Sequence, residues 1–400
     1  MRVLFVTHNI PRFDGDAAGS FVLRLAVALQ ASGTHVDIIA PGGAGASAQQ
    51  SIEGVNISRV RYAAEARMTL AYSGTMADAV RSSWSARFAL LGLLKALRRA
   101  TIAAVRAARV SGTPYDIVHV HWWFPSGLAL WRALPNGAPP IVLTMHGSDV
   151  RLAQTVRPAH AIMRAVLKTA TVRSAVSTWL AAIATRISGG LDVQVAPMPV
   201  DDRHFDPTHT DTAISESRTR NGVLFVGRLN AQKGLAHLIT ALAQPPLRDA
   251  SLDVVGEGPD HGALHAQASS LGVAARIRWH GAQPSAALAQ FYRRAMVLAM
   301  PSTEEGLGLV AVEAQLCGTP VVAFDSGGLR DVVRAEWGGT LVPPCDTTAL
   351  AIAIANVLGM PPHDAIRHAM RSAMRERFAP SVVASRYLAL YAQAMHGPHE

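Results

Sequence analysis

The sequence predicts an α/β protein built from two Rossmann-like domains. Short apolar runs alternate with amphipathic segments along most of the chain, which is the pattern of strands and crossover helices in a parallel sheet. The opening run Val3-Leu4-Phe5-Val6 recurs as Val223-Leu224-Phe225-Val226, again followed by a loop and a helix. The length of 400 residues also exceeds what one hydrophobic core usually serves. Because ligands bind beyond the carboxyl ends of such strands, we expect the functional site in a cleft where the two domains face each other.

The first half contains the elements of one such domain, which we place at residues 1–200. The helix expected at residues 21–31 has Phe21, Leu25 and Leu29 on one face, after a loop rich in Gly and Asp. Strands are expected at residues 3–6, 35–40, 117–120, 141–145 and 171–176.

The second half repeats this pattern after a polar segment, residues 201–221, with the composition of a linker. We place the second domain at residues 201–380. A last helix within residues 381–400 follows Pro380 and is expected to cross back to the first domain. Strands are expected at residues 223–226, 252–255, 276–279, 297–300 and 321–324, with a helix at 235–243.

Composition limits the class of protein. Half of the residues are apolar and 16% are charged, which excludes a disordered or coiled-coil chain. Two cysteines, Cys317 and Cys345, cannot form a disulfide framework or a cysteine zinc site, which favours a reducing compartment. The chain opens with a strand rather than a signal peptide, and its most apolar stretch, residues 89–94, is too short to span a bilayer. We therefore expect a soluble, cytoplasmic protein.

Positive charge is concentrated in the first half. Residues 1–200 carry 20 Lys and Arg against 9 Asp and Glu, whereas residues 201–400 carry 17 against 19. This asymmetry predicts that the first domain meets an anionic surface. Apolar residues at helical spacing alternate there with basic ones: Trp84, Phe88, Leu91, Leu94 and Leu97 with Arg81, Arg87, Lys95, Arg98, Arg99, Arg106 and Arg109. Two interpretations stay open for the segment from Arg81 to Arg109: a helix peripheral at the inner face of the cytoplasmic membrane, or a helix packing its apolar face on the sheet.

The most informative motif is Pro301-Ser302-Thr303-Glu304-Glu305-Gly306-Leu307-Gly308-Leu309, which continues to Glu313-Ala314 and Gly318-Thr319-Pro320-Val321-Val322. A strand ends before it, and a helix is expected to start near Gly308. Backbone amides at a helix N-terminus bind phosphate, because the positive end of the helix dipole lies behind them. Helical rise separates Glu305 from Glu313 by roughly 12 Å, near the span from the sugar to the ribose of a nucleotide sugar. The motif therefore predicts a nucleotide-sugar site.

A second loop, Gly227-Arg228-Leu229-Asn230-Ala231-Gln232-Lys233-Gly234, directly follows a strand. Arg228 and Lys233 place two cations at the carboxyl end of that strand, where they can neutralise a diphosphate. The chain has three lysines, Lys95, Lys168 and Lys233, and otherwise uses Arg for positive charge. Together with the glutamate motif, this loop predicts the diphosphate end of the same site.

These motifs resemble family 4 of the retaining glycosyltransferases, which has the two-domain GT-B fold. The resemblance covers most of the chain. The second-domain signature of the family matches at Gly227-Arg228, Lys233-Gly234, Gly256-Glu257-Gly258-Pro259 and residues 301–322. First-domain motifs match at Asp116-Ile117-Val118-His119-Val120-His121, at Thr144-Met145-His146-Gly147-Ser148-Asp149 and at the Ala18-Gly19 loop, where the family usually has two glycines.

The resemblance implies a role for each matching residue. Arg228 and Lys233 would hold the donor diphosphate, Glu305 the sugar hydroxyls, and Glu313 the ribose. His146 would lie beside the donor sugar, with Asp149 as an acceptor or donor contact. The implied catalytic residues are His146, Asp149, Arg228, Lys233 and Glu305. The implied donor-binding residues are Gly19, Gly227, Arg228, Lys233, Gly256, Ala282, Glu305, Gly306, Leu307, Gly308, Leu309 and Glu313.

The resemblance also implies an activity. We expect a hexosyltransferase that moves a sugar from a nucleotide-diphosphate donor to a sugar or lipid-linked acceptor with retention, without a metal, in cell-envelope or exopolysaccharide biosynthesis. Two alternatives are a GT-B epimerase acting on a nucleotide sugar and a non-catalytic, membrane-peripheral subunit. Nucleic acid is not expected as a partner, because the chain has no helix-turn-helix or zinc pattern.

Three other signals favour structural roles. Gly43-Ala44-Gly45-Ala46-Ser47-Ala48 resembles a dinucleotide fingerprint, but an extended stretch follows it instead of a helix. Asp14-Gly15-Asp16 resembles a metal-binding acidic pair but lies in the first loop of a Rossmann-like domain. His119 and His121 share a strand face without a third metal ligand at suggestive spacing. The Trp122-Trp123-Phe124 run is expected either to line an acceptor groove or to pack in the core.

Overall fold

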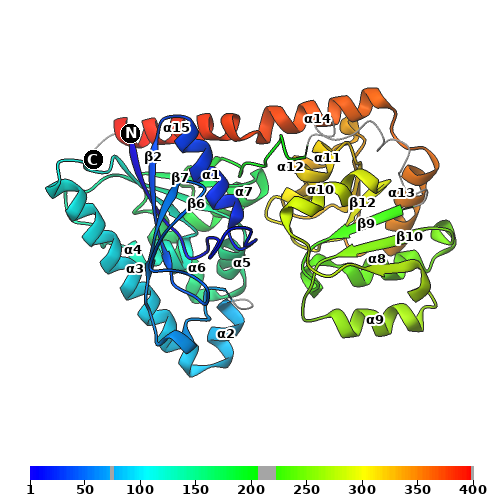
Figure 1. Ribbon diagram of the computed structural model, residues 1–400, viewed down its shortest axis with the longest axis horizontal. Coiled ribbons are helices and arrows are strands. Elements are labelled where there is room, and N and C mark those ends of the chain that lie inside the picture. Colours follow the sequence, from blue (N-terminus) through cyan, green and yellow to red (C-terminus); the bar gives the residue numbers. More distant parts are fainter. Residues whose placement is uncertain (73–75, 206–221, 398–400) are drawn as a thin grey trace. The chain divides into compact units, whose positions relative to one another are not determined.

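The computed structural model describes residues 1–72, 76–205 and 222–397, and it divides into two compact units. Unit 1 comprises Met1–Pro199 and Pro380–Glu400, and unit 2 comprises Val200–Ala379. Each unit contains one sheet with helices packed against it (Figure 1). Most of the expected linker, residues 206–221, lies outside the described residues.

Unit 1 has a mostly parallel sheet. Its strands are β1 (Arg2–Val6), β2 (His35–Pro41), β3 (Gln49–Ile52), β4 (Val55–Val60), β5 (Ile117–His121), β6 (Ile141–Met145), β7 (Val172–Ala175) and β8 (Gln194–Val195). In the described residues they form an eight-stranded sheet in the order β3-β4-β2-β1-β5-β6-β7-β8. All neighbours pair in parallel except β3 and β4. Central strand β1 is buried from Val3 to Val6, as expected of a parallel strand covered on both faces.

The helices of unit 1 include the C-terminal one. They are α1 (Ser20–Ala31), α2 (Met76–Ser82), α3 (Trp84–Val110), α4 (Leu128–Leu130), α5 (Ser148–Thr155), α6 (Arg157–Leu167), α7 (Thr178–Ser188) and α15 (Pro380–His396). Helix α15 packs beside α1 and against β5, β6 and β7 (Figure 1). Two buried tyrosines fix it: Tyr387 donates to the carbonyl of Ala196 (2.9 Å), and the Tyr391 hydroxyl bonds His119 (2.7 Å).

Unit 2 has an all-parallel sheet. Its strands are β9 (Gly222–Val226), β10 (Ser251–Val255), β11 (Ile277–Trp279), β12 (Val297–Met300), β13 (Val321–Phe324) and β14 (Thr340–Val342), in the order β11-β10-β9-β12-β13-β14. Its helices are α8 (Leu235–Leu242), α9 (His261–Ser270), α10 (Ser285–Arg294), α11 (Leu309–Leu316), α12 (Leu329–Val332), α13 (Thr347–Gly359) and α14 (Asp364–Phe378). The apolar faces of α8 and α13 enclose the core against β9, β10 and β12.

The predicted fold class, two Rossmann-like α/β halves, is confirmed. The expected strands are present within one or two residues; Arg276 is a correction, because it ends a 3₁₀ turn and the strand begins at Ile277. Strands β8 and β14 were not predicted. The extended stretch after residue 48 forms the antiparallel pair β3–β4, so no helix follows the glycine-rich segment there.

Helix α3 packs on the sheet, as one of the two interpretations of its sequence expected, but through a different apolar face. It begins after Ser83, whose hydroxyl accepts from the Ala86 amide, and it packs on unit 1 through a face that includes Leu93 and Leu97. The expected apolar face is split, because Leu97 is buried while Trp84, Phe88 and Leu91 are 73%, 70% and 62% exposed. The basic residues from Arg81 to Arg109 are exposed as well. The helix therefore packs on the sheet and also presents aromatic and basic side chains to solvent.

Among the described residues, no single helix is both long and apolar enough to cross a membrane. The segments Thr347–Gly359 and Asp364–His396 meet that criterion only as a pair, which is bent by 119°.

Candidate functional site

The loop that follows β9 is shaped by its own side chains. The Asn230 side chain accepts a hydrogen bond from the Lys233 amide at 3.1 Å and caps a 3₁₀ turn, Ala231–Lys233. Gln232 then ties this loop to the one after β12: its side chain donates to the carbonyl of Glu304 (2.9 Å), and its own carbonyl accepts from the Thr303 amide (3.0 Å). Neither Asn230 nor Gln232 was predicted to have a role.

These contacts bring Lys233 and Glu305 together. The Lys233 ammonium lies 2.6 Å from the Glu305 carboxylate, although the two residues are 72 positions apart in the sequence. Their side chains remain 26% and 13% exposed. The two side chains thus form an ion pair between two loops. These loops follow the neighbouring parallel strands β9 and β12.

The glutamate loop leads directly into α11. Gly308 is the residue before the helix and has a left-handed backbone. The carbonyl of Glu305 accepts from the Gly328 amide at 2.8 Å, which fixes the loop from the other side. The amides of Gly306 and Leu307 donate no hydrogen bond to any described residue, and Leu309 is the first residue of the helix. The loop therefore carries the unsatisfied donors typical of an anion site at a helix N-terminus.

Glu313 lies further along the same helix and is 6% exposed. Its carboxylate accepts a hydrogen bond from the hydroxyl of Tyr292 at 2.8 Å, and Tyr292 is fully buried in α10. Tyr292 belongs to no recognised motif, so this partner of Glu313 could not be predicted from the sequence. A buried carboxylate held in this way has a fixed orientation, which suits the recognition of a rigid pair of hydroxyls.

Arg228 differs from Lys233 in its surroundings. Its side chain is exposed and makes no hydrogen bond or ion pair with any described residue. Ala282 is also exposed, and its amide donates to the Glu257 carboxylate at 3.4 Å. The guanidinium of Arg228 is thus available to a ligand.

Gly256 joins the loops that contain Gly227 and Ala282. Its amide donates to the carbonyl of Gly281 at 2.8 Å, and its φ of +141° is disfavoured for other residues. A Cβ at this position would lie 1.9 Å from the carbonyl oxygen of Gly227. The glycine therefore allows the two loops to touch.

Replacing Gly256 by alanine is expected to lower the free energy of unfolding of unit 2 by about 2–3 kcal/mol, because the backbone must shift and the φ angle is strained. The matched control is Gly262→Ala in α9, where nothing lies within 4 Å of the added methyl. That change is expected to stabilise the helix by roughly 0.5–1 kcal/mol. Urea denaturation followed by tryptophan fluorescence measures both, and equal midpoints for Gly256→Ala and the wild type would contradict the close contact.

His146 follows β6 in unit 1 and belongs to a cluster of aromatic rings. Its Nε2 lies 3.1 Å from Nδ1 of His121, and its ring centroid is 4.2 Å from that of Trp122. Burial, with smaller contributions from His121 and His8, lowers the pKa of His146 well below its ordinary value. The imidazole is therefore neutral near pH 7. In a hydrogen bond between two neutral imidazoles one nitrogen donates and the other accepts, so the tautomers of His121 and His146 are coupled.

Asp149, at the start of α5, is 2% exposed. One carboxylate oxygen accepts from the amides of His146 (3.2 Å) and Gly147 (3.0 Å), and the other from the amide of Trp123 (3.1 Å). Burial nevertheless raises its pKa to about 6. Both oxygens thus face backbone amides, and the side chain holds the His146 loop in place.

Gly19 precedes α1 in a left-handed conformation, with φ +63°. A Cβ there would lie 2.4 Å from the carbonyl oxygen of Asn9, so the packing of the loop itself requires glycine. The loop is closed by Asp16, which accepts from the side chain of Arg12 (2.7 Å) and from the amide of Ala18 (3.2 Å).

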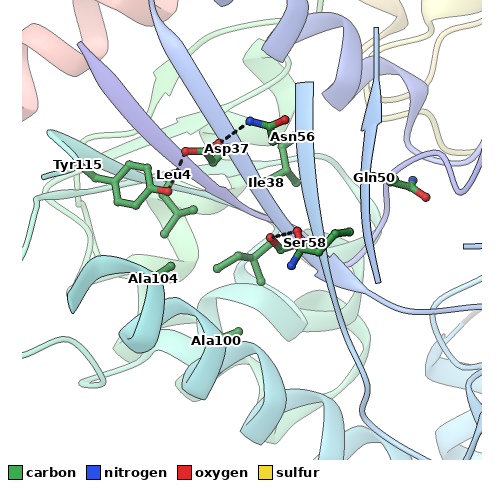
Figure 2. A pocket seen from close by; sticks show the side chains of 11 residues that line it. Leu4, Asp37, Ile38, Gln50, Asn56, Ser58, Ala100, Ala104 and Tyr115 are labelled. Atoms are coloured by element: carbon green, nitrogen blue, oxygen red, sulfur yellow. Dashed lines mark hydrogen bonds between the residues drawn. The ribbon is translucent and has the colours of Figure 1, made fainter. Parts of the chain in front are cut away.

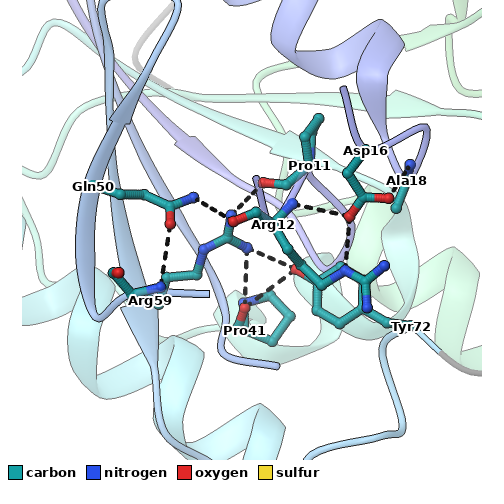
Figure 3. A network of polar contacts seen from close by, with 9 residues as sticks. Pro11, Arg12, Asp16, Ala18, Pro41, Gln50, Arg59 and Tyr72 are labelled. Carbon is teal, nitrogen blue, oxygen red and sulfur yellow. Dashed lines mark hydrogen bonds and ion pairs between the residues drawn. The ribbon is translucent and has the colours of Figure 1, made fainter. Parts of the chain in front are cut away.

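Arg59 of β4 stabilises this loop by a hydrogen bond to its backbone (Figure 3). It is 8% exposed, and its guanidinium donates to the carbonyl of Pro11 within the loop. It also donates to the carbonyl of Pro41 (3.3 Å) and to the hydroxyl of Tyr72 (2.8 Å). One buried cation therefore links the loop after β1 to the ends of β2 and β4. Arg59 lies in a stretch expected only to be extended, so no sequence signal pointed to it.

Three of the side chains weighed as metal ligands, Asp16, His119 and His121, have protein partners. Asp16 pairs with Arg12, and His121 pairs with His146. His119 bonds Tyr391 and Thr144, the latter at 2.8 Å. No group of three or more His, Cys, Asp or Glu in the described part of the chain is arranged to hold a metal ion. Of the site residues expected from the sequence, Gly19, His146 and Asp149 lie in unit 1 and the others in unit 2.

Comparison with known proteins gives two family matches. Residues 17–201 match the family described as "Glycosyl transferase 4-like domain", and residues 209–377 match "Glycosyl transferases group 1". The chain is 34% identical over 303 residues to a D-inositol 3-phosphate glycosyltransferase of Xylanimonas cellulosilytica, covering 70% of this chain and 72% of that one. It is 31% identical over 321 residues to the protein of the same name from Thermobispora bispora, covering 71% and 72%.

Solved structures share the fold. A sucrose-phosphate synthase from Thermosynechococcus elongatus matches with a TM-score of 0.80 at 24% identity, over 100% of both chains. The Anabaena protein HepE in complex with UDP-glucose matches with a TM-score of 0.71 at 19% identity, over 98% of this chain and 100% of that one. The expected GT-B fold is thereby confirmed.

Proposed function

Because the chain belongs to glycosyltransferase family 4 and is a retaining glycosyltransferase with a nucleotide-sugar donor, we propose that unit 2 holds the donor and unit 1 the acceptor. The Lys233–Glu305 pair beside the unsatisfied amides before α11 is the observation that carries this assignment. Lys233, the free Arg228 and the Gly306 to Leu309 amides bind the diphosphate. Glu305 binds sugar hydroxyls, and Glu313 binds the ribose.

The transfer makes one main electrostatic demand. The bond between the anomeric carbon and the diphosphate oxygen breaks, an acceptor oxygen bonds to the same face of that carbon, and the acceptor proton passes to the departing phosphate. Negative charge therefore develops on the leaving oxygens, where Arg228, Lys233 and the helix amides stabilise it. These groups supply the neutralisation that a metal provides elsewhere, so we expect EDTA to leave the rate unchanged.

In unit 1, we assign His146 to the donor sugar and Gly19 to the donor phosphate. A neutral imidazole can accept a hydrogen bond from a sugar hydroxyl without placing a second positive charge near the anomeric carbon. Asp149 acts by positioning the His146 loop through its three amide contacts. The loop of Gly19 is positioned in turn by Arg59.

The proposed acceptor is a sugar or lipid-linked sugar of cell-envelope or exopolysaccharide biosynthesis, and the transferred unit is a hexosyl group. The exposed aromatic and basic face of α3 favours an acceptor at a membrane. A second candidate acceptor is D-inositol 3-phosphate, which the names of the relatives support.

The experiment begins with thermal-shift screening of UDP-, GDP- and ADP-hexoses. The stabilising donor is then incubated with D-inositol 3-phosphate or with a lipid-linked sugar, and the anomeric configuration of the product is determined by NMR. Transfer with retention to either acceptor supports the assignment and selects between them. Epimerised donor formed without acceptor, or stabilisation by none of the nucleotides, would refute it.

We also propose that α3 brings unit 1 to an anionic membrane surface at the inner face of the cytoplasmic membrane. Trp84, Phe88 and Leu91 form an exposed apolar stripe. The guanidinium of Arg87 lies 4.3 Å from the centroid of the Trp84 ring. Aromatic side chains enter the interface while neighbouring cations meet anionic head groups, so the two features act together.

Replacing Trp84 and Phe88 together by alanine is expected to weaken binding to phosphatidylglycerol vesicles by at least about tenfold, because two large apolar side chains no longer enter the interface. Co-sedimentation measures the binding, with phosphatidylcholine vesicles for comparison. Met360→Ala, which removes an 84% exposed apolar side chain in unit 2, is the matched control. Equal sedimentation of the double variant and the wild type would exclude this face of α3.

A further inference from the structure

Unit 1 contains a cavity of about 720 Å³ between its sheet and α3 (Figure 2). This volume lies within the range of small-molecule sites, roughly 300–1,000 Å³. The cavity is bounded by β1, β2, β3 and β4 on the sheet side and by the second half of α3 on the other.

The strand face that lines the cavity is unusually polar. Leu4, Asp37 and Asn56 are neighbours in register across β1, β2 and β4, so their side chains share one face. Asp37 is half-buried and Asn56 is exposed, so the cavity is open to solvent on this side and its polar groups are accessible to a ligand. Helix α3 contributes Ala100 and Ala104 opposite them, and these short side chains leave the space unfilled.

Hydrogen bonds within the cavity orient its polar groups (Figure 2). Asp37 accepts from the Tyr115 hydroxyl at 2.8 Å and from the Asn56 amide at 3.4 Å, and Ser58 donates to Gln49 at 2.9 Å. Burial, and then the contact with Asp37, raises the pKa of Tyr115 to about 12, so its hydroxyl keeps its proton. The Asn56 carbonyl oxygen and the Gln49 amide nitrogen make no hydrogen bond with any described residue. The cavity thus offers pre-oriented acceptors and donors together.

The charge of the lining limits which classes of ligand can bind in the cavity. Among the described residues that line the cavity, Asp37 is the one charged side chain, so phosphates and carboxylates are disfavoured. Arg2 contacts the Asp37 carboxylate at 3.3 Å from outside the lining, which offsets its charge and disfavours a cationic ligand as well. These exclusions leave a neutral ligand that both donates and accepts many hydrogen bonds.

We propose that this cavity is a second carbohydrate site, which binds a short neutral oligosaccharide through Asp37, Asn56, Gln49, Ser58 and Tyr115. Carbohydrate hydroxyls both donate and accept, which matches the mixed lining. Asp37 and Asn56 lie in the amino-terminal halves of β2 and β4, whereas the loops of Gly19 and His146 follow the carboxyl ends of β1 and β6. The site therefore shares no residue with the proposed transfer site and does not rest on it.

The test uses maltotriose, cellotriose and mannotriose as probes, with isothermal titration calorimetry and saturation-transfer NMR on the full chain. We expect at least one of them to bind the wild type. Ala104→Leu fills the cavity without removing a polar group and is expected to weaken that binding by at least about tenfold. Ala103→Leu adds the same side chain at an exposed position of the same helix turn and is expected to leave binding unchanged.

Two further arms separate this site from the transfer site. His146→Ala is expected to leave trisaccharide binding intact, and Ala104→Leu is expected to leave turnover of the nucleotide sugar intact. Trigalacturonate, which carries carboxylates, is expected not to bind the cavity. Absence of binding by all three neutral probes, equal binding by Ala104→Leu, or equal binding of trigalacturonate would overturn the proposal, whatever the outcome for glycosyl transfer.

Discussion

Lys233→Ala is expected to lower kcat/KM for nucleotide-sugar turnover by about 10²–10³, the usual cost of removing one group that stabilises a developing negative charge. The ammonium of Lys233 lies 2.6 Å from the carboxylate of Glu305. Gln232 links the loop of Lys233 to the glutamate loop by hydrogen bonds. Removal of the ammonium takes away a cation for the departing diphosphate. It also leaves the carboxylate of Glu305 without its partner, so the same loop would then repel the donor.

The conservative variant Lys233→Arg separates charge from geometry. It keeps a cation but replaces a compact ammonium by a planar guanidinium, so we expect a loss smaller than that of Lys233→Ala. Lys168→Ala, which removes an exposed lysine in unit 1, is the matched control and is expected to retain the wild-type rate. Circular dichroism checks the fold of each variant. Equal turnover by Lys233→Ala and the wild type would exclude the assigned diphosphate site.

The sequence carried enough information to predict the fold class, because each buried strand leaves a local signature. Short apolar runs marked β1, β5, β6, β9, β12 and β13 independently of their neighbours. The repetition of one run near residues 3 and 223 then indicated two similar halves. Strands with few residues or a polar face, such as β8 and the β3–β4 pair, lacked this signature and were not recognised as strands.

Contacts between distant segments were harder to predict. The resemblance assigned Lys233 and Glu305 to different parts of a donor, but their ion pair depends on how two loops leave neighbouring strands. The partner of Glu313, Tyr292, lies in another helix without a motif. A residue's type and spacing reveal what it can do chemically, whereas its partner is decided by strand order and loop path.

The same distinction explains why the buried face of α3 was not predicted correctly. Its periodicity correctly indicated a helix, but apolar side chains occur on two faces of it. Leu93 and Leu97 lie on the buried face, whereas Trp84, Phe88 and Leu91 lie on another face and are exposed. Apolar spacing indicates a helix but does not tell which apolar face will be buried.

Acidification is expected to destabilise unit 1 at a pH well above the ordinary pKa of a carboxyl group. His8, His119, His121 and His146 form a cluster in which burial lowers every pKa: that of His8 to about 4, that of His121 to about 3, and the other two well below the ordinary value. In the unfolded chain each of them binds a proton near pH 6.5. Between pH 6.5 and the folded-state pKa values, the unfolded state therefore binds protons that the folded state does not bind.

The sign and size of the change in folding stability follow from this difference in proton binding. Stability from each neutral histidine is fully present above pH 6.5 and falls by about 1.4 kcal/mol per pH unit as the pH drops toward the folded-state pKa. Asp149 acts in the opposite sense, because its raised pKa of about 6 favours the folded state once it is protonated. One such carboxyl offsets about one histidine, so the net loss at pH 5 amounts to several kcal/mol, comparable with the whole stability of an ordinary domain.

Urea denaturation at pH 7.5, 6.5, 5.5 and 5.0 measures this loss, and its slope against pH counts the protons taken up on unfolding. His121→Gln removes one of the buried imidazoles and is expected to make the slope shallower by about one proton, whatever its effect on stability at pH 7.5. His160→Gln, at an exposed position of α6, is expected to leave the slope unchanged. A flat profile between pH 7.5 and 5.0 would show that the four imidazoles are not held neutral, and the coupling of the His121 and His146 tautomers would then lose its basis.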